Sequence, residues 1–433
     1  MEAHFFGRDR DYAAYFLNTL HRHALTRHGK FKRFNRKILV QTIPEHRFTQ
    51  IRDKLVALGV IEVNHSYQAG SRSKGYRLKP KYVKSRKVSC RTEFLSRKIL
   101  ARRRDRERQL LPVHKWLRSK FDVLSFDLKC AAKIMPTMKP KPGSTLTDRE
   151  YQDLLDEICN RRLPSRHISV CKYGRVHSSI TSLPKALRSC LRVDGEQLVG
   201  IDITSSQPLL VGLIAKRHWE SADARHRMLT RDFDDRSTPY VVQEIEGMSQ
   251  RIANGSGDGD TQTNETLSIM CYKSALSPEK TGANGGDRVQ SGAIPADLVE
   301  YLRLCESGQL YEHLQVPGQT RERTKVELFT VFYGKAGMWN PLMRQLSTEF
   351  PTVAAMLRAL KRKSYQHPAR LMQSYESTMV IAIICGRLMR ERPNIPIFTI
   401  HDSILTTPAH VEYVKSVMQE EFGKIGKCRL RED

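Results

Sequence analysis

Four side chains recur at four-residue intervals in the segment RERTKVELFTVFYG: Arg321, Lys325, Phe329 and Tyr333. Residues four apart lie one turn apart on the same face of an α-helix, so this spacing predicts a helix with two cations and two aromatic rings in one stripe. Gly334 is expected to end that helix. Two cations can grip a triphosphate while a ring covers a base. The alternative is a surface helix whose aromatic residues face a core.

Two short apolar stretches elsewhere in the carboxy-terminal half each lead to an aspartate. QLVGIDI predicts a strand that delivers Asp202 at its end and is followed by a small-residue turn and an apolar helix. NIPIFTIHDSILTTP predicts a tight hairpin with His401 and Asp402 at its turn. Phosphoryl transfer by two divalent ions needs carboxylates from separate strands, which Asp202 and Asp402 supply. Taken alone, Asp202 could equally be a helix cap.

In this order the three segments resemble motifs A, B and C of the family A DNA polymerases and the related phage-type single-subunit RNA polymerases. The resemblance covers about residues 170 to 425, and the R-x3-K-x3-F-x3-Y-G run is its most specific part. The family segment that contacts primer and template is similar to YGRVHSSITSLPKALRSCL, where Arg175 and Arg188 match. The resemblance implies an α+β right-hand polymerase core with palm and fingers.

The resemblance also implies a metal site and a triphosphate site. Asp202 and Asp402 would hold two Mg2+ ions, which Mn2+ can replace, and the carbonyl of Ile203 would assist. Arg321 and Lys325 would bind the β- and γ-phosphates of the incoming nucleoside triphosphate. Lys325 could also protonate the leaving pyrophosphate.

The remaining matches concern the base pair, the sugar and the nucleic acid. Phe329, Tyr333 and Gly334 would border the nascent pair, with Gln207 beside its sugar. Gln373 and Glu376 belong to LMQSYESTMVIAI, a helix that we expect to pack beneath motif C and whose polar residues could reach the template. The residues implied to contact primer or template are His401, Arg175, Arg188 and Gln373.

Two positions depart from the DNA polymerase pattern. Those enzymes have a Glu that helps to exclude ribonucleotides where this chain has Gln207, and a further Glu after the motif C His-Asp where it has Ser403. Phage-type RNA polymerases share the second departure, so the choice between ribo- and deoxyribonucleotides stays open. Too little sequence precedes Asp202 for a 3′–5′ exonuclease domain and a standard thumb, so we expect no proofreading.

Residues 34–83 predict a helix followed by a hairpin. The helix HRFTQIRDKLVALGV should end at Gly59, and the hairpin VIEVNHSY to YRLKPKYV has a basic tip with Arg72 and Lys74. This order resembles a winged helix used on nucleic acid or on a protein partner; the alternative is a solvated basic loop without a ligand. The residues expected on the buried helix face are Phe48, Ile51, Leu55 and Leu58.

The chain carries a formal charge of +27 over 433 residues, a surplus suited to binding a polyanion such as nucleic acid. Residues 84–120 contain 14 Lys and Arg against three acidic residues. The apolar residues here are expected to give the segment one face to pack, so that the basic face can lie along a phosphate backbone; the alternative is a solvated helix face. These apolar residues are Phe94, Leu95, Ile99, Leu100, Leu110 and Leu111.

Composition argues against membrane and secreted proteins. No apolar stretch approaches the roughly 20 residues that span a bilayer, and the amino terminus lacks the apolar segment of a secretory signal. Nine scattered cysteines form no C-x-x-C pair, so neither a zinc site nor a disulfide framework is indicated. We therefore expect a cytoplasmic protein with reduced thiols and no membrane partner.

The sequence thus predicts three parts: a winged-helix-like domain (1–83), a basic helical connector (84–165) and a family A-like polymerase core (166–433) with a mobile insertion at 249–296. The function expected is template-directed nucleotidyl transfer on DNA, as primer synthesis during replication of a mobile element. The alternatives are a primer-dependent DNA polymerase without proofreading and a non-catalytic DNA-binding replication initiator. Expected partners are single-stranded template, duplex product, nucleoside triphosphates and, optionally, a small accessory replication protein.

Overall fold

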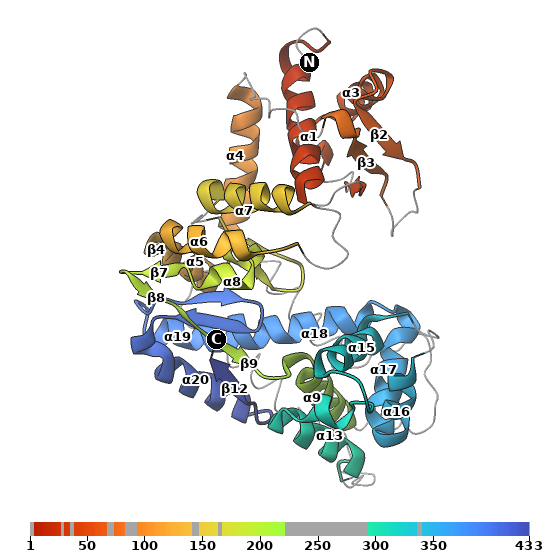
Figure 1. Cartoon of the computed structure of the whole chain (residues 1–433), viewed down its shortest axis with the longest axis vertical. Helices are drawn as coiled ribbons and strands as arrows, with labels where there is room; N and C mark the ends of the chain where they lie inside the picture. The colour runs from red at the N-terminus through yellow and green to blue at the C-terminus, as the bar shows by residue number, and fades with distance from the viewer. Residues whose placement is uncertain are drawn as a thin grey trace, which may run out of the picture. The chain divides into compact units, whose positions relative to one another are not determined.

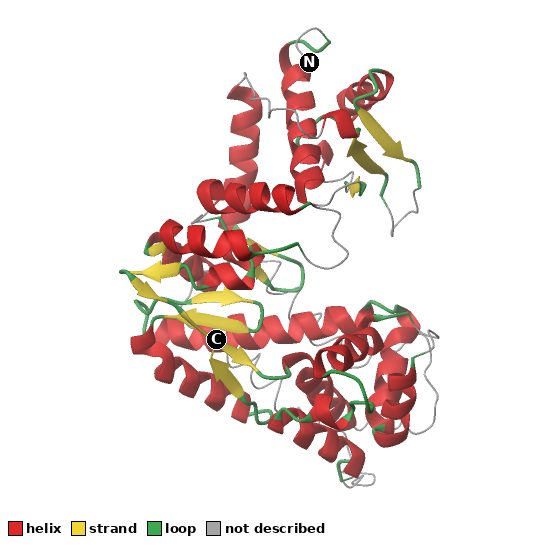
Figure 2. Ribbon diagram, viewed as in Figure 1, coloured by secondary structure: helices red, strands yellow, loops and turns green. Residues whose placement is uncertain are grey.

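The computed structural model describes residues 4–26, 30–34, 39–66, 73–82, 93–140, 147–162, 167–220, 293–335 and 340–432. Its fold is mixed α+β and mostly helical (Figure 2), as expected for the fold class. The insertion expected at 249–296 lies outside the described residues, apart from its last four positions. No helix in the described part of the chain is both long and apolar enough to cross a bilayer. The cysteines at the described positions are free thiols.

The chain divides into two compact units. The amino-terminal unit comprises Met1–Gln109 and Leu128–Arg162, and the carboxy-terminal unit comprises Leu110–Asp127 and Leu163–Asp433. Residues 84–165, expected as one connector, contribute to both. Helices α4 (Glu93–Arg108) and α7 (Asp148–Arg162) belong to the first unit, and α5 (Pro112–Ser119) belongs to the second.

The amino-terminal unit combines helices with a small antiparallel sheet of order β1-β3-β2. Its core contains an aromatic cluster in which the Phe16 ring meets Phe48 and Tyr76 edge to face at 5.1 and 5.5 Å. Its further elements are α1 (Gly7–Thr26), β1 (Lys32–Arg33), α3 (Glu45–Ala57), β2 (Ile61–Asn64), β3 (Gly75–Leu78), η1 (Pro80–Tyr82), α6 (Leu128–Ile134) and η3 (Met135–Thr137) (Figure 1).

The predicted helix and hairpin of this unit are confirmed as α3, β2 and β3. Phe48, Ile51 and Leu55 are buried on one face of α3, and Leu58 is partly buried just beyond its end. Gly59 has a φ of +63°, the left-handed conformation that glycine adopts without strain after a helix. The hairpin tip at 67–72, with Arg72, lies outside the described residues.

The apolar face predicted for residues 84–120 contains fewer residues in the structure than expected. On α4, Leu95 is buried and Ile99, four residues on, packs partly against the same core. Phe94 and Leu100 are 41% and 48% exposed, because each sits about 100° around the helix from that pair. The expectation of a single face containing all these residues was therefore wrong.

The carboxy-terminal unit holds an antiparallel sheet of order β10-β11-β9-β12. Its strands are β9 (Val199–Ile203), β10 (Phe398–Ile400), β11 (Ser403–Thr406) and β12 (Leu430–Glu432). Two smaller antiparallel sheets accompany it. One has the order β4 (Leu124–Phe126), β7 (Leu191–Val193), β8 (Glu196–Gln197), and the other pairs β5 (Ser169–Val170) with β6 (Val176–His177). The predicted strand before Asp202 and the predicted hairpin around His401 are confirmed.

Helices make up most of this unit. A continuous helical run passes through α18 (His367–Ser377), the π-helical η5 (Thr378–Cys385) and α19 (Gly386–Glu391). Helix α15 (Arg321–Tyr333), the predicted stripe helix, contacts α14, α16 and α18 (Figure 1). The others are η2 (Lys120–Asp122), η4 (Ile180–Ser182), α8 (Lys185–Arg188), α9 (Ser206–Glu220), α13 (Ala296–Ser307), α14 (Leu310–His313), α16 (Pro341–Glu349), α17 (Pro351–Lys363), η6 (Pro408–His410) and α20 (Val411–Gly423).

Candidate active site

Adjacent strands bring the two predicted aspartates to one end of the main sheet. β11 pairs with β9 in antiparallel register, with Ile404 opposite Ile201. Asp202 lies one residue beyond Ile201 on β9, and Asp402 lies two residues before Ile404, in the turn that precedes β11. Both carboxylates therefore leave the sheet at the same end, although 200 positions separate them in the sequence.

The turn that presents Asp402 is backbone-strained and held by a serine. His401 has a φ of +58°, a left-handed conformation that is uncommon for a residue with a side chain. The Ser206 hydroxyl, at the start of α9, donates a hydrogen bond to Oδ2 of Asp402. Burial lowers the pKa of His401, and the Arg175 charge acts in the same direction. His401 is thus held as a neutral imidazole close to the carboxylate.

Asp202 has a cationic neighbour on β12, the strand that pairs with β9 on the edge opposite β11. In the pairing of β12 with β9, Arg431 stands opposite Asp202, and its Nη2 lies 3.4 Å from Oδ2 of the aspartate. Ile203, the third residue expected at the metal site, is buried and pairs with Leu430. The positive charge of the Arg431 guanidinium partly offsets the negative charge of the Asp202 carboxylate.

The two aspartates fit the ligand type of Mg2+. Magnesium is commonly held by one or two carboxylates, with water and phosphate oxygens completing its coordination shell. Among the described residues no cluster of three or more His, Cys, Asp or Glu side chains could hold a metal. A pair of carboxylates suits an ion that also binds substrate phosphate. It does not suit a closed, all-protein metal site.

A polar network stands beside the carboxylates. The Tyr333 hydroxyl donates to Oε1 of Gln207 at 2.5 Å, and Nε2 of Gln207 donates to Oε2 of Glu376. Arg175 donates to both oxygens of Glu376, from Nε at 2.9 Å and from Nη2 at 2.7 Å. The network thereby joins the end of α15, the first turn of α9, helix α18 and the β5–β6 hairpin.

Glu376 is the buried centre of this network. It is 3% exposed, and burial raises its pKa while the Arg175 guanidinium opposes that rise. Burial also raises the pKa of Tyr333, which keeps its hydroxyl protonated as a donor. A small cavity is bordered by both Glu376 and Asp402. Its walls are Ile203, Ser206, Leu210, Glu376, Val380, Asp402 and Phe422.

The stripe on α15 is only partly available to a ligand. Arg321, expected to grip a triphosphate, instead forms an ion pair with Glu312 and lies over the Tyr311 ring at 4.9 Å. Lys325 is exposed, with its Nζ 5.8 Å from the centre of the Phe329 ring. Lys325 is therefore better placed than Arg321 to meet phosphate.

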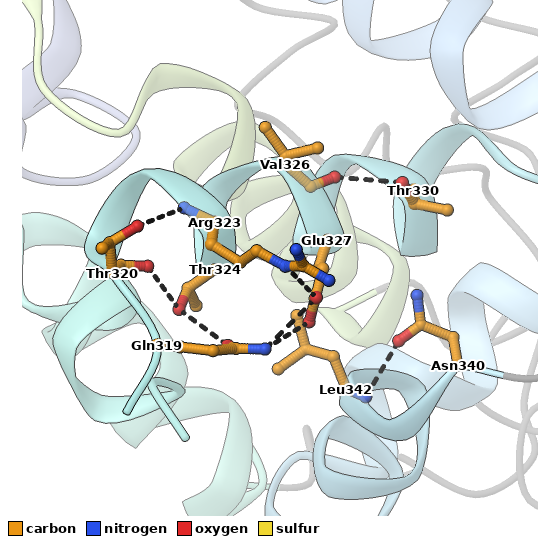
Figure 3. Close-up of polar contacts among 9 residues, drawn as sticks. All are labelled: Gln319, Thr320, Arg323, Thr324, Val326, Glu327, Thr330, Asn340 and Leu342. Atoms are coloured by element: carbon orange, nitrogen blue, oxygen red, sulfur yellow. Dashed lines mark hydrogen bonds and ion pairs between the residues drawn. The ribbon is translucent and has the colours of Figure 1, made fainter. Parts of the chain in front are cut away.

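Capping and side-chain contacts fix the rotation of α15 about its axis (Figure 3). The Thr320 hydroxyl accepts from the Arg323 amide at 3.3 Å, which satisfies one unpaired N–H of the first turn. Glu327 accepts from Arg323 at 3.0 Å and from Gln319 at 3.2 Å. At the other end, Nζ of Lys361 donates to the Gly334 carbonyl at 3.0 Å. These contacts hold the Lys325–Tyr333 face in place.

Three of the residues expected to contact primer or template lie near one another, because the charges of Arg175 and Arg188 both act on His401. Nε of Arg188, at the end of α8, donates to the Leu183 carbonyl at 3.4 Å. The His401 ring lies 6.4 Å from that of His177. Gln373 is half-buried on α18, three residues before Glu376. Arg175 is bound to Glu376, so its guanidinium is already engaged.

Sequence reasoning missed Ser206 and Arg431, and it placed Glu376 on the helix beneath motif C without its role as the buried partner of Arg175 and Gln207. The burial of Glu376 had a visible signal, because a carboxylate three residues before the apolar run MVIAII is expected to be buried and paired. Ser206 follows Asp202 in the small-residue turn but could equally have been a helix cap. Nothing near Arg431 in the sequence indicates its partner.

Comparison with known proteins identifies no relative. The chain matches no protein-family model and no curated protein. The geometry of the site is therefore the basis for the functional conclusion.

Proposed function

We propose that this chain is a template-directed nucleotidyltransferase that acts on DNA and synthesises primers in the replication of a mobile element. The observation that carries the proposal is the pair of carboxylates on adjacent strands, with Tyr333 at the end of α15 close enough for the Asp402 charge to act on it. Acidic residues for divalent cations and a cation for phosphate are the parts that phosphoryl transfer requires. The +27 formal charge supports a nucleic-acid substrate.

The proposed reaction joins a 3′-hydroxyl oxygen to the α-phosphorus of a nucleoside triphosphate and releases pyrophosphate. Asp202 and Asp402 would hold two Mg2+ ions, which supply charge neutralisation and a more acidic hydroxyl. Lys325 binds the triphosphate and donates a proton to the leaving group. Tyr333 and Phe329, with ring centres 5.8 Å apart, border the base and sugar.

A second candidate is a primer-dependent DNA polymerase. The charge of Arg188 acts on His401, so two residues expected to contact primer or template lie near each other, which favours extension of a bound primer. The two candidates differ in whether synthesis starts without a primer and in the sugar that is used.

The test is incubation of the full chain with single-stranded DNA, Mg2+ and labelled nucleotides, with and without primer. Asp202→Asn and Asp402→Asn should each lower incorporation by at least about 100-fold while DNA binding stays within about twofold, since binding comes mainly from Lys and Arg contacts to phosphate. Asp194→Asn is the matched control, because Asp194 is exposed in the β7–β8 turn with a φ of +50°, which Asn tolerates. Near wild-type incorporation by either active-site variant would rule out the proposal.

A further inference from the structure

The amide of Gln207 is fixed in one orientation by two hydrogen bonds of opposite polarity. An ionised carboxylate can only accept hydrogen bonds, so Glu376 requires the NH2 group of Gln207 to face it. The Gln207 carbonyl must then face Tyr333, and the Tyr333 hydroxyl must act as the donor. Glu376 thereby decides which way the hydrogen of the Tyr333 hydroxyl points.

Glu376 is itself held firmly. It is almost fully buried, and Arg175 makes two parallel charge-assisted bonds to it. Such bidentate pairs are geometrically demanding and roughly twice as strong as neutral hydrogen bonds. The orientation imposed on Gln207 therefore starts from a rigid ion pair that joins α18 to the β5–β6 hairpin.

The direction of the Tyr333 O–H bond affects how this residue can recognise a sugar. Because its hydrogen is given to Gln207, the Tyr333 oxygen can offer only lone pairs to a further group. A ribose 2′-hydroxyl can donate to such an oxygen, whereas deoxyribose has no group to do so. The network thus presents an acceptor on the face of α15 that would meet the incoming sugar.

We infer that Glu376 is a positioning residue for sugar selection, which acts through Gln207 to make Tyr333 an acceptor for the ribose 2′-hydroxyl. This inference rests on the proposed nucleotidyl transfer. Without the carboxylate, the Gln207 amide can rotate by half a turn, and its NH2 then occupies the Tyr333 lone pair that would serve ribose. Arg175 takes part by holding Glu376 through two hydrogen bonds.

The experiment compares kcat/KM for ribo- and deoxyribonucleotides in wild type and Glu376→Gln. We expect the ribo-to-deoxy ratio to fall about threefold to tenfold in the variant, the range that one hydrogen bond accounts for. A purely structural role would lower both values together and leave the ratio unchanged. The double variant Gln207→Glu, Glu376→Gln swaps the two side chains and is called the exchanged variant. It should restore the ribo-to-deoxy ratio, since its carboxylate at position 207 again accepts from Tyr333.

Two controls sharpen the test. In a Tyr333→Phe background, Glu376→Gln should leave the ratio unchanged, because the hydroxyl through which it acts is gone. Melting temperatures report folding; if Glu376→Gln does not fold, the exchanged variant compared with Gln207→Glu alone carries the test. Incorporation with an unaltered ratio, or no rescue by the exchange, overturns this inference alone. An absence of incorporation by wild type overturns the proposed function together with it.

Discussion

Arg431 and Asp202 stand opposite each other on paired strands, with Nη2 of the arginine 3.4 Å from Oδ2 of the aspartate. The arginine side chain is 62% exposed and the aspartate side chain 26% exposed. A positive charge this close makes the carboxylate a weaker ligand for a divalent cation, although solvent screens part of the effect.

Replacing Arg431 should therefore lower the Mg2+ requirement of the reaction. In Arg431→Gln we expect the Mg2+ concentration for half-maximal incorporation to fall about twofold to fivefold, with a smaller change at high salt because screening grows. Arg431→Lys keeps the charge and serves as the matched control. A Mg2+ requirement that stays the same or rises in Arg431→Gln would show that the arginine does not compete with the ion.

Two arginines of α4 should behave differently. Arg102 donates to the buried Thr42 and, at 2.9 Å, to Gln41, whereas Arg104 is exposed. Arg102→Ala should lower the free energy of unfolding of the amino-terminal unit by about 1 to 2 kcal/mol, as expected for two lost hydrogen bonds. If the basic face of α4 binds DNA, Arg104→Ala should reduce the slope of log K against log salt by about 1.

These effects are separated by chemical denaturation and by DNA binding at several salt concentrations. Glu107→Gln on the same helix serves as a control for a general change in charge. An unchanged salt slope in Arg104→Ala would assign α4 to a solvated surface without DNA contact.

A buried histidine should make stability depend on pH. His114 on α5 is 4% exposed, and burial lowers its pKa from 6.5 to about 4. Because the unfolded chain binds the proton more readily, stability is lost as pH falls from about 6.5 toward 4. This one group should cost about 2 kcal/mol between pH 7.5 and pH 5.

The measurement is urea unfolding at both pH values, followed through tryptophan fluorescence; Trp116 lies on the same helix. His114→Gln removes the titration, so its loss of stability on acidification should be about 2 kcal/mol smaller than that of wild type. An equal loss in both proteins would mean that His114 binds its proton equally well in the folded and unfolded states.

Local patterns were sufficient to predict the secondary structure around the site. The four-residue recurrence from Arg321 to Tyr333 specifies a helix because its periodicity matches the α-helical turn, and α15 has those bounds. The two short β-rich pieces that flank His401-Asp402 likewise predicted the β10–β11 hairpin. Such features depend on neighbours within a few residues, so the sequence alone determines them.

Tertiary structure alone decided how the charges pair. Arg175 and Glu376 are 201 positions apart, and Arg431 and Asp202 are 229 apart. Arg321 belongs to the predicted stripe, yet it turns to Glu312 on the neighbouring α14. Glu376 is buried and takes the partner that packing brings within reach, because leaving a buried charge unpaired costs several kcal/mol. The more exposed pairs of Arg431 and Arg321 likewise form only where the fold brings the two side chains together. Packing depends on the whole fold, so no local pattern in the sequence could predict these pairs.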